Sequence, residues 1–182
     1  DNLHSLNVQS ISGNLTCTKT DNVVTVNMGE PKFDWKDIPL ASQQNTQKVL
    51  LDEFEAFCLS MGNPHAVIFM QNLNELESLD LNLVGPRLEK NINFPKFTNI
   101  EFACVLEDKT IRMRVWERGV GVTMACGSGA CATLVAAFKK NKSSKVNEII
   151  LDGGSLSVEL LNNGTVTLSG DTEKVYEGII GN

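Results

Sequence analysis

Residues 116–131 read Trp-Glu-Arg-Gly-Val-Gly-Val-Thr-Met-Ala-Cys-Gly-Ser-Gly-Ala-Cys, and the residues after them turn aliphatic and then basic as far as Lys140. This order predicts a helix whose first turn approaches another group closely and whose last turn complements the helix dipole. Cys126 stands where the helix begins. A helix N-terminus lowers the pKa of a thiol and binds carboxylates, so we expect Cys126 to be the thiol most sensitive to alkylation. The alternative is that Cys126 and Cys131 are small core residues, which we favour for Cys131.

The rest of the chain has the pattern of short strands joined by turns. An antiparallel segment is predicted from residue 6 to 28, with turns at Gly13-Asn14 and Asp21-Asn22, and a hairpin is predicted around Glu107-Asp108-Lys109. Residues 73–90 predict two short helices with a break at Gly85-Pro86. Four more short strands follow the cysteine-rich helix, at residues 148–151, 155–161, 165–169 and 175–180. The chain thus combines many short strands with few helices.

Composition limits the classes of function. The 182 residues are 42% hydrophobic, which is enough to form one core. Their formal net charge is -6, and a negative charge disfavours binding to the phosphate backbone of nucleic acids. No stretch approaches the roughly 18 apolar residues of a membrane span, and Asp1–Ser10 does not resemble a signal peptide. Five cysteines, an odd number, favour reduced thiols. We therefore expect a soluble cytoplasmic protein that binds neither nucleic acid nor membrane.

Two other chemistries are disfavoured by spacing. A zinc site usually needs cysteine pairs such as Cys-x-x-Cys, and the separation of Cys126 from Cys131 does not match. A phosphate-binding loop needs Lys followed by Ser or Thr after its glycines, and none follows here. We expect no metal site.

Several blocks of sequence together resemble the diaminopimelate epimerase family. Glu117-Arg118-Gly119 followed by residues 125–131 resembles the family signature, in which a cysteine flanked in this way is the catalytic thiol. Four further blocks match in the same order, at residues 26–31, 61–65, 98–102 and 153–156. The resemblance covers nearly all of this chain but only the C-terminal half of such an enzyme.

The resemblance implies a fold and a domain division. The fold would be a diaminopimelate-epimerase-like α+β domain in which antiparallel-rich strands wrap a central helix, the one that begins near Cys126. Residues 1–172 would form the C-terminal epimerase domain. Residues 173–182 would be a terminal strand that, in the family, returns to the N-terminal domain.

The resemblance also implies roles for particular residues. Cys126 would be one of two acid/base thiols, and His65 and Glu117 would support the catalytic thiols. The residues expected to bind substrate are Asn63, Asn99 and Arg118 at its distal amino-acid end, and the N–H groups of Gly127 and Ser128 at the carboxylate of the reacting carbon. Without the resemblance, His65 and Asn63 could be turn residues, Asn99 a strand-end cap, and Glu117 with Arg118 an exposed ion pair of little energetic value.

The implied function is the interconversion of LL- and meso-diaminopimelate in lysine and cell-wall precursor biosynthesis. The family uses one cysteine from each of two domains, without pyridoxal phosphate or any other cofactor. Residues 12–17 imitate the motif of the first cysteine but lack its second Gly and its Arg, so we interpret Cys17 as a strand residue. We therefore expect this chain to be inactive alone and to need the N-terminal half as a partner, and we leave a homodimer open.

Two alternatives remain at this point. One is a noncatalytic module that binds an amino acid or a partner through the helix N-terminus. The other is another cofactor-independent racemase, such as a proline-racemase-like isomerase. Asn63, Asn99 and Arg118 argue against the second alternative, because they imply a second amino-acid end on the substrate.

Overall fold

The computed structural model describes residues 5–10, 13–106, 110–179 and 181. Within them, strands dominate and helices are few. The elements in chain order are β1 (Ser5–Ser10), β2 (Gly13–Thr20), β3 (Val23–Asn27), β4 (Val49–Leu51), β5 (Phe54–Ser60), β6 (Pro64–Phe69), α1 (Leu73–Ser78), α2 (Leu81–Glu89), β7 (Asn99–Val105), β8 (Ile111–Glu117), β9 (Gly121–Val122), α3 (Gly127–Lys139), β10 (Val146–Leu151), β11 (Gly154–Leu160) and β12 (Val166–Asp171).

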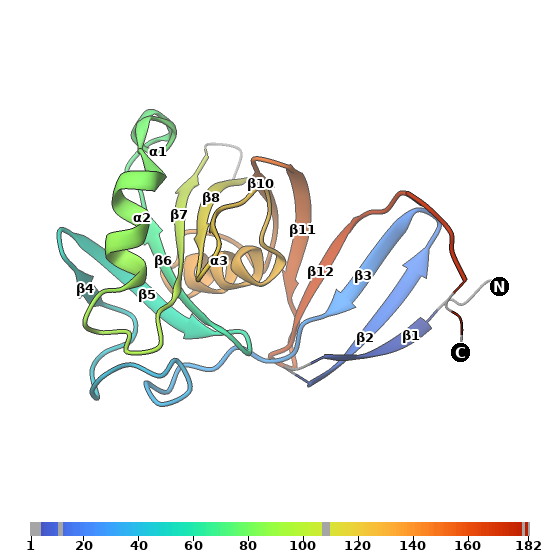
Figure 1. The fold of residues 1–182 in the computed structure, drawn as a ribbon, viewed down its shortest axis with the longest axis horizontal. Helices are drawn as coiled ribbons and strands as arrows, with labels where there is room; N and C mark the ends of the chain where they lie inside the picture. Colours follow the sequence, from blue (N-terminus) through green and yellow to red (C-terminus); the bar gives the residue numbers. More distant parts are fainter. Residues whose placement is uncertain (1–4, 11–12, 107–109, 180, 182) are drawn as a thin grey trace.

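All described strands belong to one continuous sheet. Its order is β1-β2-β3-β12-β11-β10-β8-β7-β6-β5-β4, and β9 pairs with β8 outside this path. Neighbours are antiparallel except β6 with β7 and β8 with β10, which are parallel. Figure 1 shows the ribbon of β1, β2 and β3 extending to one side, joined to the rest through β12. The prediction of a sheet-rich α+β class is confirmed at this level.

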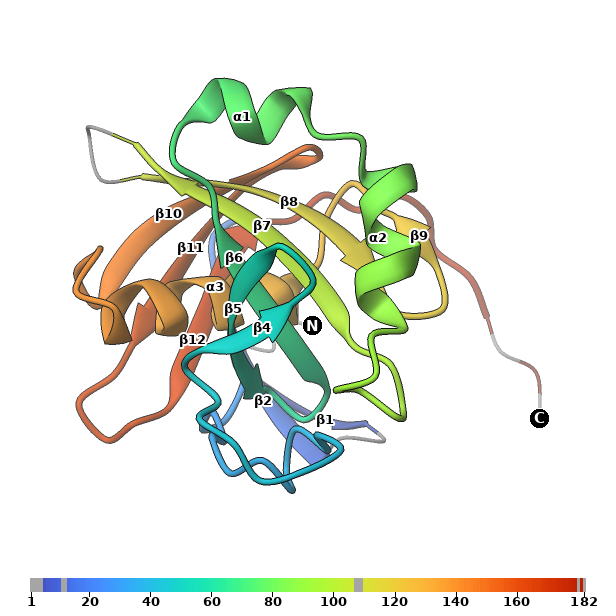
Figure 2. The same ribbon diagram turned by 90° about the vertical axis from the view of Figure 1, so that its left-hand side faces the viewer.

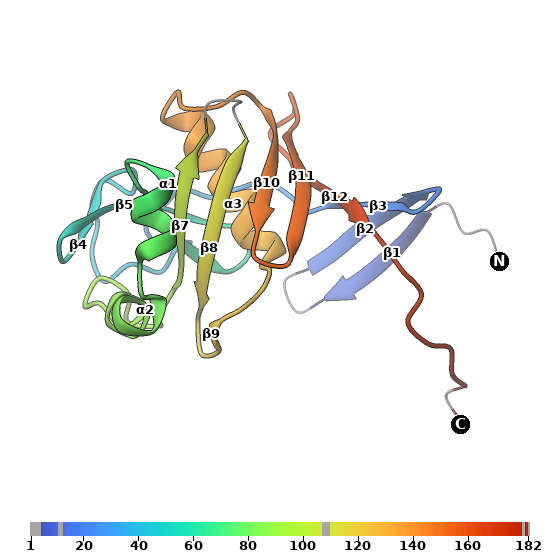
Figure 3. The same ribbon diagram turned by 90° about the horizontal axis from the view of Figure 1, so that it is seen from above.

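Helix α3 packs against strands on several sides. It contacts β5, β6, β7, β8, β10, β11 and β12, and Figure 3 shows it beneath the strands seen from above. Every residue from Gly129 to Ala137 is buried, which is the expected state of a helix that is apolar all round. Cys131 is fully buried among them, which confirms the interpretation of this residue as part of the core.

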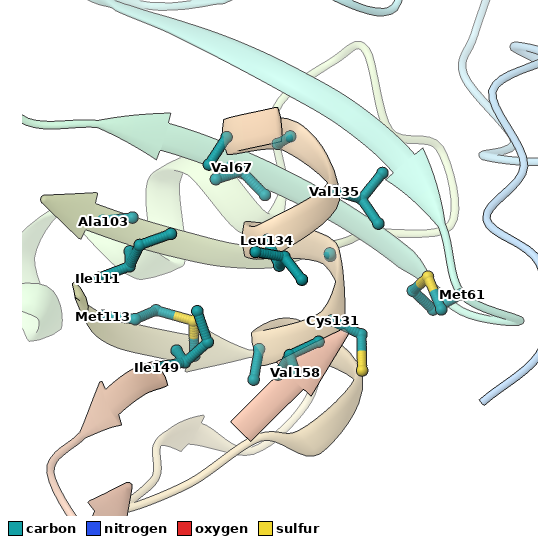
Figure 4. Packing of buried hydrophobic residues seen from close by; sticks show 14 of the residues in the cluster. Met61, Val67, Ala103, Ile111, Met113, Cys131, Leu134, Val135, Ile149 and Val158 are labelled. Atoms are coloured by element: carbon teal, nitrogen blue, oxygen red, sulfur yellow. The ribbon is translucent and has the colours of Figure 1, made fainter. Parts of the chain in front are cut away.

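The sheet carries a hydrophobic core on each face. Along β6, Val67 joins the core around α3, whereas its neighbours Ala66 and Ile68 join the core on the side of α1 and α2. This alternation follows from the two-residue period of a strand. Figure 4 shows Val67 with Leu134 of α3 in the first core, and Figure 2 shows α1 and α2 beside β7 and β8.

The two short helices differ from the prediction in where they are divided. The break lies at Leu79-Asp80, and Pro86 lies inside α2, so the expected break at Gly85-Pro86 is wrong. The physical reason is helix capping. The Asp80 side chain accepts a hydrogen bond from the Asn82 N–H and so starts α2 five residues before the glycine.

The strand predicted at residues 175–180 is not formed over the part of it that the structure describes. Residues 173–179 follow β12 without regular secondary structure, and Val175, Tyr176 and Ile179 are at least 85% exposed. The predicted turn at Glu107-Asp108-Lys109 lies outside the described residues, between β7 and β8, which do pair antiparallel. No helix in the described part of the chain combines the length and apolarity needed to cross a bilayer.

Candidate active site

Cys126 is the residue from which α3 starts. It occupies the N-cap position with an extended backbone, φ -141° and ψ 104°, and the helix begins at Gly127. Gly127 and Ser128 are therefore in the first turn, where N–H groups have no carbonyl partner within the helix. The predicted helix N-terminus beside the thiol is confirmed.

The electrostatic environment of the Cys126 thiol differs from the prediction. Burial first, and then the negative charges of Glu101 and Glu117, raise its pKa to about 12. The Ser128 hydroxyl and the Gly129 amide act in the opposite direction but less strongly. The residue is only 7% exposed, so desolvation of the charged form outweighs the helix N-terminus. The expectation of a lowered thiol pKa is wrong, and Cys126 is protonated at neutral pH.

A chain of hydrogen bonds runs from the Cys126 thiol into the sheet. The sulfur lies 3.7 Å from Ser128 Oγ, which accepts from Asn63 Nδ2 at 3.2 Å. Asn63 Oδ1 lies 3.0 Å from His65 Nε2, and His65 Nδ1 lies 2.6 Å from Glu101 Oε1. These hydrogen bonds thus connect α3 to the turn between β5 and β6, to β6 and to β7.

His65 lies in the interior, not in a surface turn. It is fully buried in β6 and is hydrogen-bonded through both ring nitrogens. A buried imidazole with two polar partners is held in one orientation. His65 and Asn63 are therefore brought together with Cys126 and Ser128, as members of one network.

Glu101 is the residue of this network that the sequence analysis missed. It appeared only inside a matched block, without a role. The signal was present, because an acidic residue stands among Ile100, Phe102, Ala103 and Cys104 in a strand that is otherwise buried and apolar. A fully buried carboxylate needs a partner to offset the cost of burial, and such a residue suggests a functional site.

Asn99 and Arg118 form a second pair next to the first network. Asn99 is the register partner of His65 across β6 and β7. Its Nδ2 donates to the Pro64 carbonyl at 2.8 Å, and its Oδ1 accepts from the Arg118 N–H at 2.9 Å. The Arg118 guanidinium lies on the exposed surface and donates to the Lys96 carbonyl at 3.4 Å. Asn99 therefore positions the backbone of Arg118.

Glu117, the last residue of β8, belongs to the loop that leads to Cys126. Its Oε1 accepts a hydrogen bond from Thr123 Oγ1 at 2.5 Å. The carboxylate is also close enough to raise the pKa of the Cys126 thiol. The structure thus gathers all eight predicted site residues around the start of α3 and the adjoining ends of β6, β7 and β8. No cluster of three or more His, Cys, Asp or Glu side chains suited to a metal ion occurs in the part of the chain that is described.

Solved structures with a similar fold include enzymes that act at amino-acid stereocentres. A probable proline racemase from Agrobacterium radiobacter is 16% identical, with a TM-score of 0.60 over 94% of this chain and 59% of that chain. A hydroxyproline epimerase from Agrobacterium vitis, solved with bound trans-4-hydroxy-L-proline, is 13% identical, with a TM-score of 0.62 over 94% and 58%. At such identities the likeness shows the fold, which is that of the proline racemase and epimerase class.

Sequence comparison is more specific. Residues 57–175 match the diaminopimelate epimerase family. A diaminopimelate epimerase from Rhodospirillum centenum is 44% identical over 175 residues, covering 94% of this chain and 59% of the relative. One from Acidiphilium cryptum is 43% identical over 164 residues, covering 88% and 58%. The chain belongs to the diaminopimelate epimerase family, and it spans about three fifths of the length of these relatives.

Proposed function

We propose that this chain is the C-terminal part of a diaminopimelate epimerase and supplies one of the two acid/base thiols that interconvert LL- and meso-diaminopimelate. The observation that carries the proposal is the position of Cys126 at the start of α3, tied through Ser128 and Asn63 to His65. Membership of the family supports the same assignment.

Inversion at a carbon that bears hydrogen needs two groups, one for each face. A base removes the proton from one face, and an acid delivers a proton to the other. In this assignment Cys126 rests as a thiol, because burial and two carboxylates raise its pKa. It is therefore the proton donor in the direction in which the opposite group acts as base, and it becomes the base in the reverse direction.

The first turn of α3 would stabilise the substrate as charge develops. Free N–H groups of Gly127 and Ser128 would bind the carboxylate at the reacting carbon, where the carbanion gains enolate character. Asn63, Asn99 and Arg118 would bind the distal amino-acid end. His65 and Glu117 would support the thiols without cofactor or metal. This division of roles requires a substrate with two amino-acid ends, which argues against a proline-type substrate.

The same proposal extends to the architecture. Residues 1–172 would be one epimerase domain in which the strands wrap α3 as the central helix, and its burial and contacts with seven strands support this. Residues 173–182 would pair with the partner domain, and the exposure of Val175 and Tyr176 is consistent with such a role.

The second thiol would come from that N-terminal half, and a homodimer stays open. Five unpaired cysteines agree with a cytoplasmic location.

The test is proton exchange at the α-carbon of diaminopimelate in deuterated water. We expect the chain alone to give no exchange above background, and the chain complemented by the N-terminal half of the Rhodospirillum centenum relative to give exchange and epimerisation. Cys126→Ser should abolish the complemented activity, whereas Cys131→Ser, a change about one and a half turns further along the same helix, should leave the exchange measurable. Turnover by the isolated chain would refute the one-thiol proposal.

The main rival is a noncatalytic amino-acid-binding module. Calorimetry with diaminopimelate separates the two readings of the site. Binding without exchange in the complemented protein would favour the module, whereas binding together with exchange that depends on Cys126 would favour the enzyme. Exchange on proline but not on diaminopimelate would instead favour a proline-racemase-like isomerase.

A further inference from the structure

Glu101 is an unusual residue for the centre of a sheet. It lies in β7 with no exposed surface, and one of its oxygens, Oε2, has no hydrogen-bond partner among the described residues. Buried polar atoms without a partner are rare and call for an explanation. The other oxygen of Glu101, Oε1, lies 2.6 Å from His65 Nδ1.

The protons of the Glu101–His65 pair follow from the partner on the far side of the ring. His65 Nε2 faces Asn63 Oδ1 at 3.0 Å, and an amide oxygen can only accept, so Nε2 must carry a proton. The second proton then lies between Nδ1 and Glu101 Oε1. That shared proton offsets the carboxylate charge within the pair, which lowers the cost of burying Glu101 beside an imidazole.

The opposite orientation of the Asn63 amide has a higher cost. It would place an NH₂ group against Nε2 and so require a bare Nε2, with the only ring proton on Nδ1. Glu101 would then be a buried anion whose one polar partner is the Nδ1–H of a neutral ring, at 2.6 Å. The proton shared by Glu101 and His65 therefore favours the orientation in which Asn63 Nδ2 donates to Ser128 Oγ at 3.2 Å.

This orientation sets what Ser128 can do for the thiol. Its oxygen already accepts from Asn63, so its hydroxyl proton is free to be donated toward the Cys126 sulfur at 3.7 Å. Gly129 lies between the two ends of this hydrogen-bond chain, and its lack of a side chain leaves room for both Glu101 and Cys126. A Cβ at this position would lie 2.8 Å from Glu101 Oε1 and 3.2 Å from the Cys126 sulfur.

We propose that Glu101 is a positioning residue: by keeping His65 a donor through Nε2, it orients the Asn63 amide and thereby holds the Ser128 hydroxyl as a hydrogen-bond donor to Cys126. This inference deepens the proposed function, on which its catalytic meaning rests. The hydrogen-bond chain itself is a property of the protein and can be tested without turnover.

The test compares Glu101→Gln with Glu101→Leu, which both lack the charge. Gln can donate from its amide to Nδ1 and so preserves the donor at Nε2, whereas Leu cannot. We expect alkylation of Cys126, followed by mass spectrometry, to be about fivefold slower in the Leu variant than in the Gln variant, as the loss of one hydrogen bond predicts. The difference should vanish when Ser128→Ala is added to both. Equal rates in the two variants, or a difference that persists with Ser128→Ala, would overturn the proposal.

Two controls make the outcome decisive. Cys131 is fully buried on the same helix, so an increase in its alkylation reports opening of the core and identifies a variant that has not folded. If Glu101→Leu fails in this way, nitrogen NMR of the His65 ring in the native chain and in Glu101→Gln decides. Both must show a protonated Nε2, and an unprotonated Nε2 in either contradicts the proposal. Because neither readout needs substrate, the proposed function can fail while this inference holds, and the reverse.

Discussion

Glu89 on α2 accepts a hydrogen bond from the indole Nε1 of Trp116 at 2.8 Å. Its second oxygen accepts from the Gly119 N–H, also at 2.8 Å. One buried carboxylate therefore holds both sides of the turn that carries Glu117 and Arg118. The position of that turn depends on α2, although α2 contributes no side chain to the candidate site.

We expect Glu89→Ala to lower the free energy of unfolding by about 1–3 kcal/mol, because it leaves the indole and a backbone N–H without their partner. Glu89→Gln should cost less, since its amide oxygen can still accept one of the two bonds. Urea unfolding of both variants measures the difference. A Glu89→Ala variant as stable as the native chain would show that the turn is held by other contacts.

Gly85 should not tolerate a side chain. A Cβ at this position would lie 2.3–2.6 Å from three atoms of the Trp116 ring, so Gly85→Ala must push α2 away from β8. We expect a loss of about 1–3 kcal/mol in unfolding free energy, as for other overpacked sites, and a changed Trp fluorescence. Leu83→Ala, at a 74% exposed position of the same helix, is the matched control and should be nearly neutral.

Asn99 is expected to act on stability as well as on binding. Its amide bridges the start of β6 to the end of β8 through Pro64 and Arg118. Asn99→Ala should cost about 1–3 kcal/mol by leaving the buried Pro64 carbonyl and the partly buried Arg118 N–H unpaired, whereas Asn162→Ala, at an exposed position, should cost little. Thermal unfolding tests this, and equal melting temperatures for the two variants would contradict it.

The raised pKa of Cys126 predicts a loss of stability at alkaline pH. The folded value of about 12 lies above the reference value of 9.0, so the native state holds the proton more tightly than the unfolded chain. The stabilisation is complete below about pH 9 and falls as pH rises toward 12, by up to about 1.4 kcal/mol per pH unit. The unfolding free energies of the native chain and of Cys126→Ala should therefore converge or cross as the pH rises through this range. Parallel curves of unfolding free energy against pH would contradict a raised Cys126 pKa.

The order of cysteine alkylation should follow exposure. Cys17 is half-buried on β2, Cys126 is 7% exposed, and Cys58 and Cys131 are fully buried. We therefore expect Cys17 to react first and Cys126 before Cys58 and Cys131, which revises the expectation that Cys126 leads. Mass spectrometry after brief alkylation gives the order. Early labelling of Cys58 would mean that the core around β5 opens.

The parts of the structure that depend on local signals were predictable. The hairpin of β2 and β3 turns at Asp21, where φ is +54°, and the start of α3 follows its small residues. The division between α1 and α2 was not predictable in this way. The prediction placed the start of the second helix at Pro86, whereas the side chain of Asp80 caps α2 and sets the boundary. Both residues are helix-start signals, and the structure shows that α2 is capped by Asp80.

The sequence by itself determined the family, the strand-rich class and the candidate thiol, because these rest on residue types in a fixed order along the chain. Only the tertiary structure decided how that thiol behaves. Its protonation depends on burial and on Glu101, a residue 25 positions away in another strand. Desolvation and hydrogen bonding act through space, so no pattern of neighbours along the chain could have placed a carboxylate, an imidazole and an amide in line with Cys126.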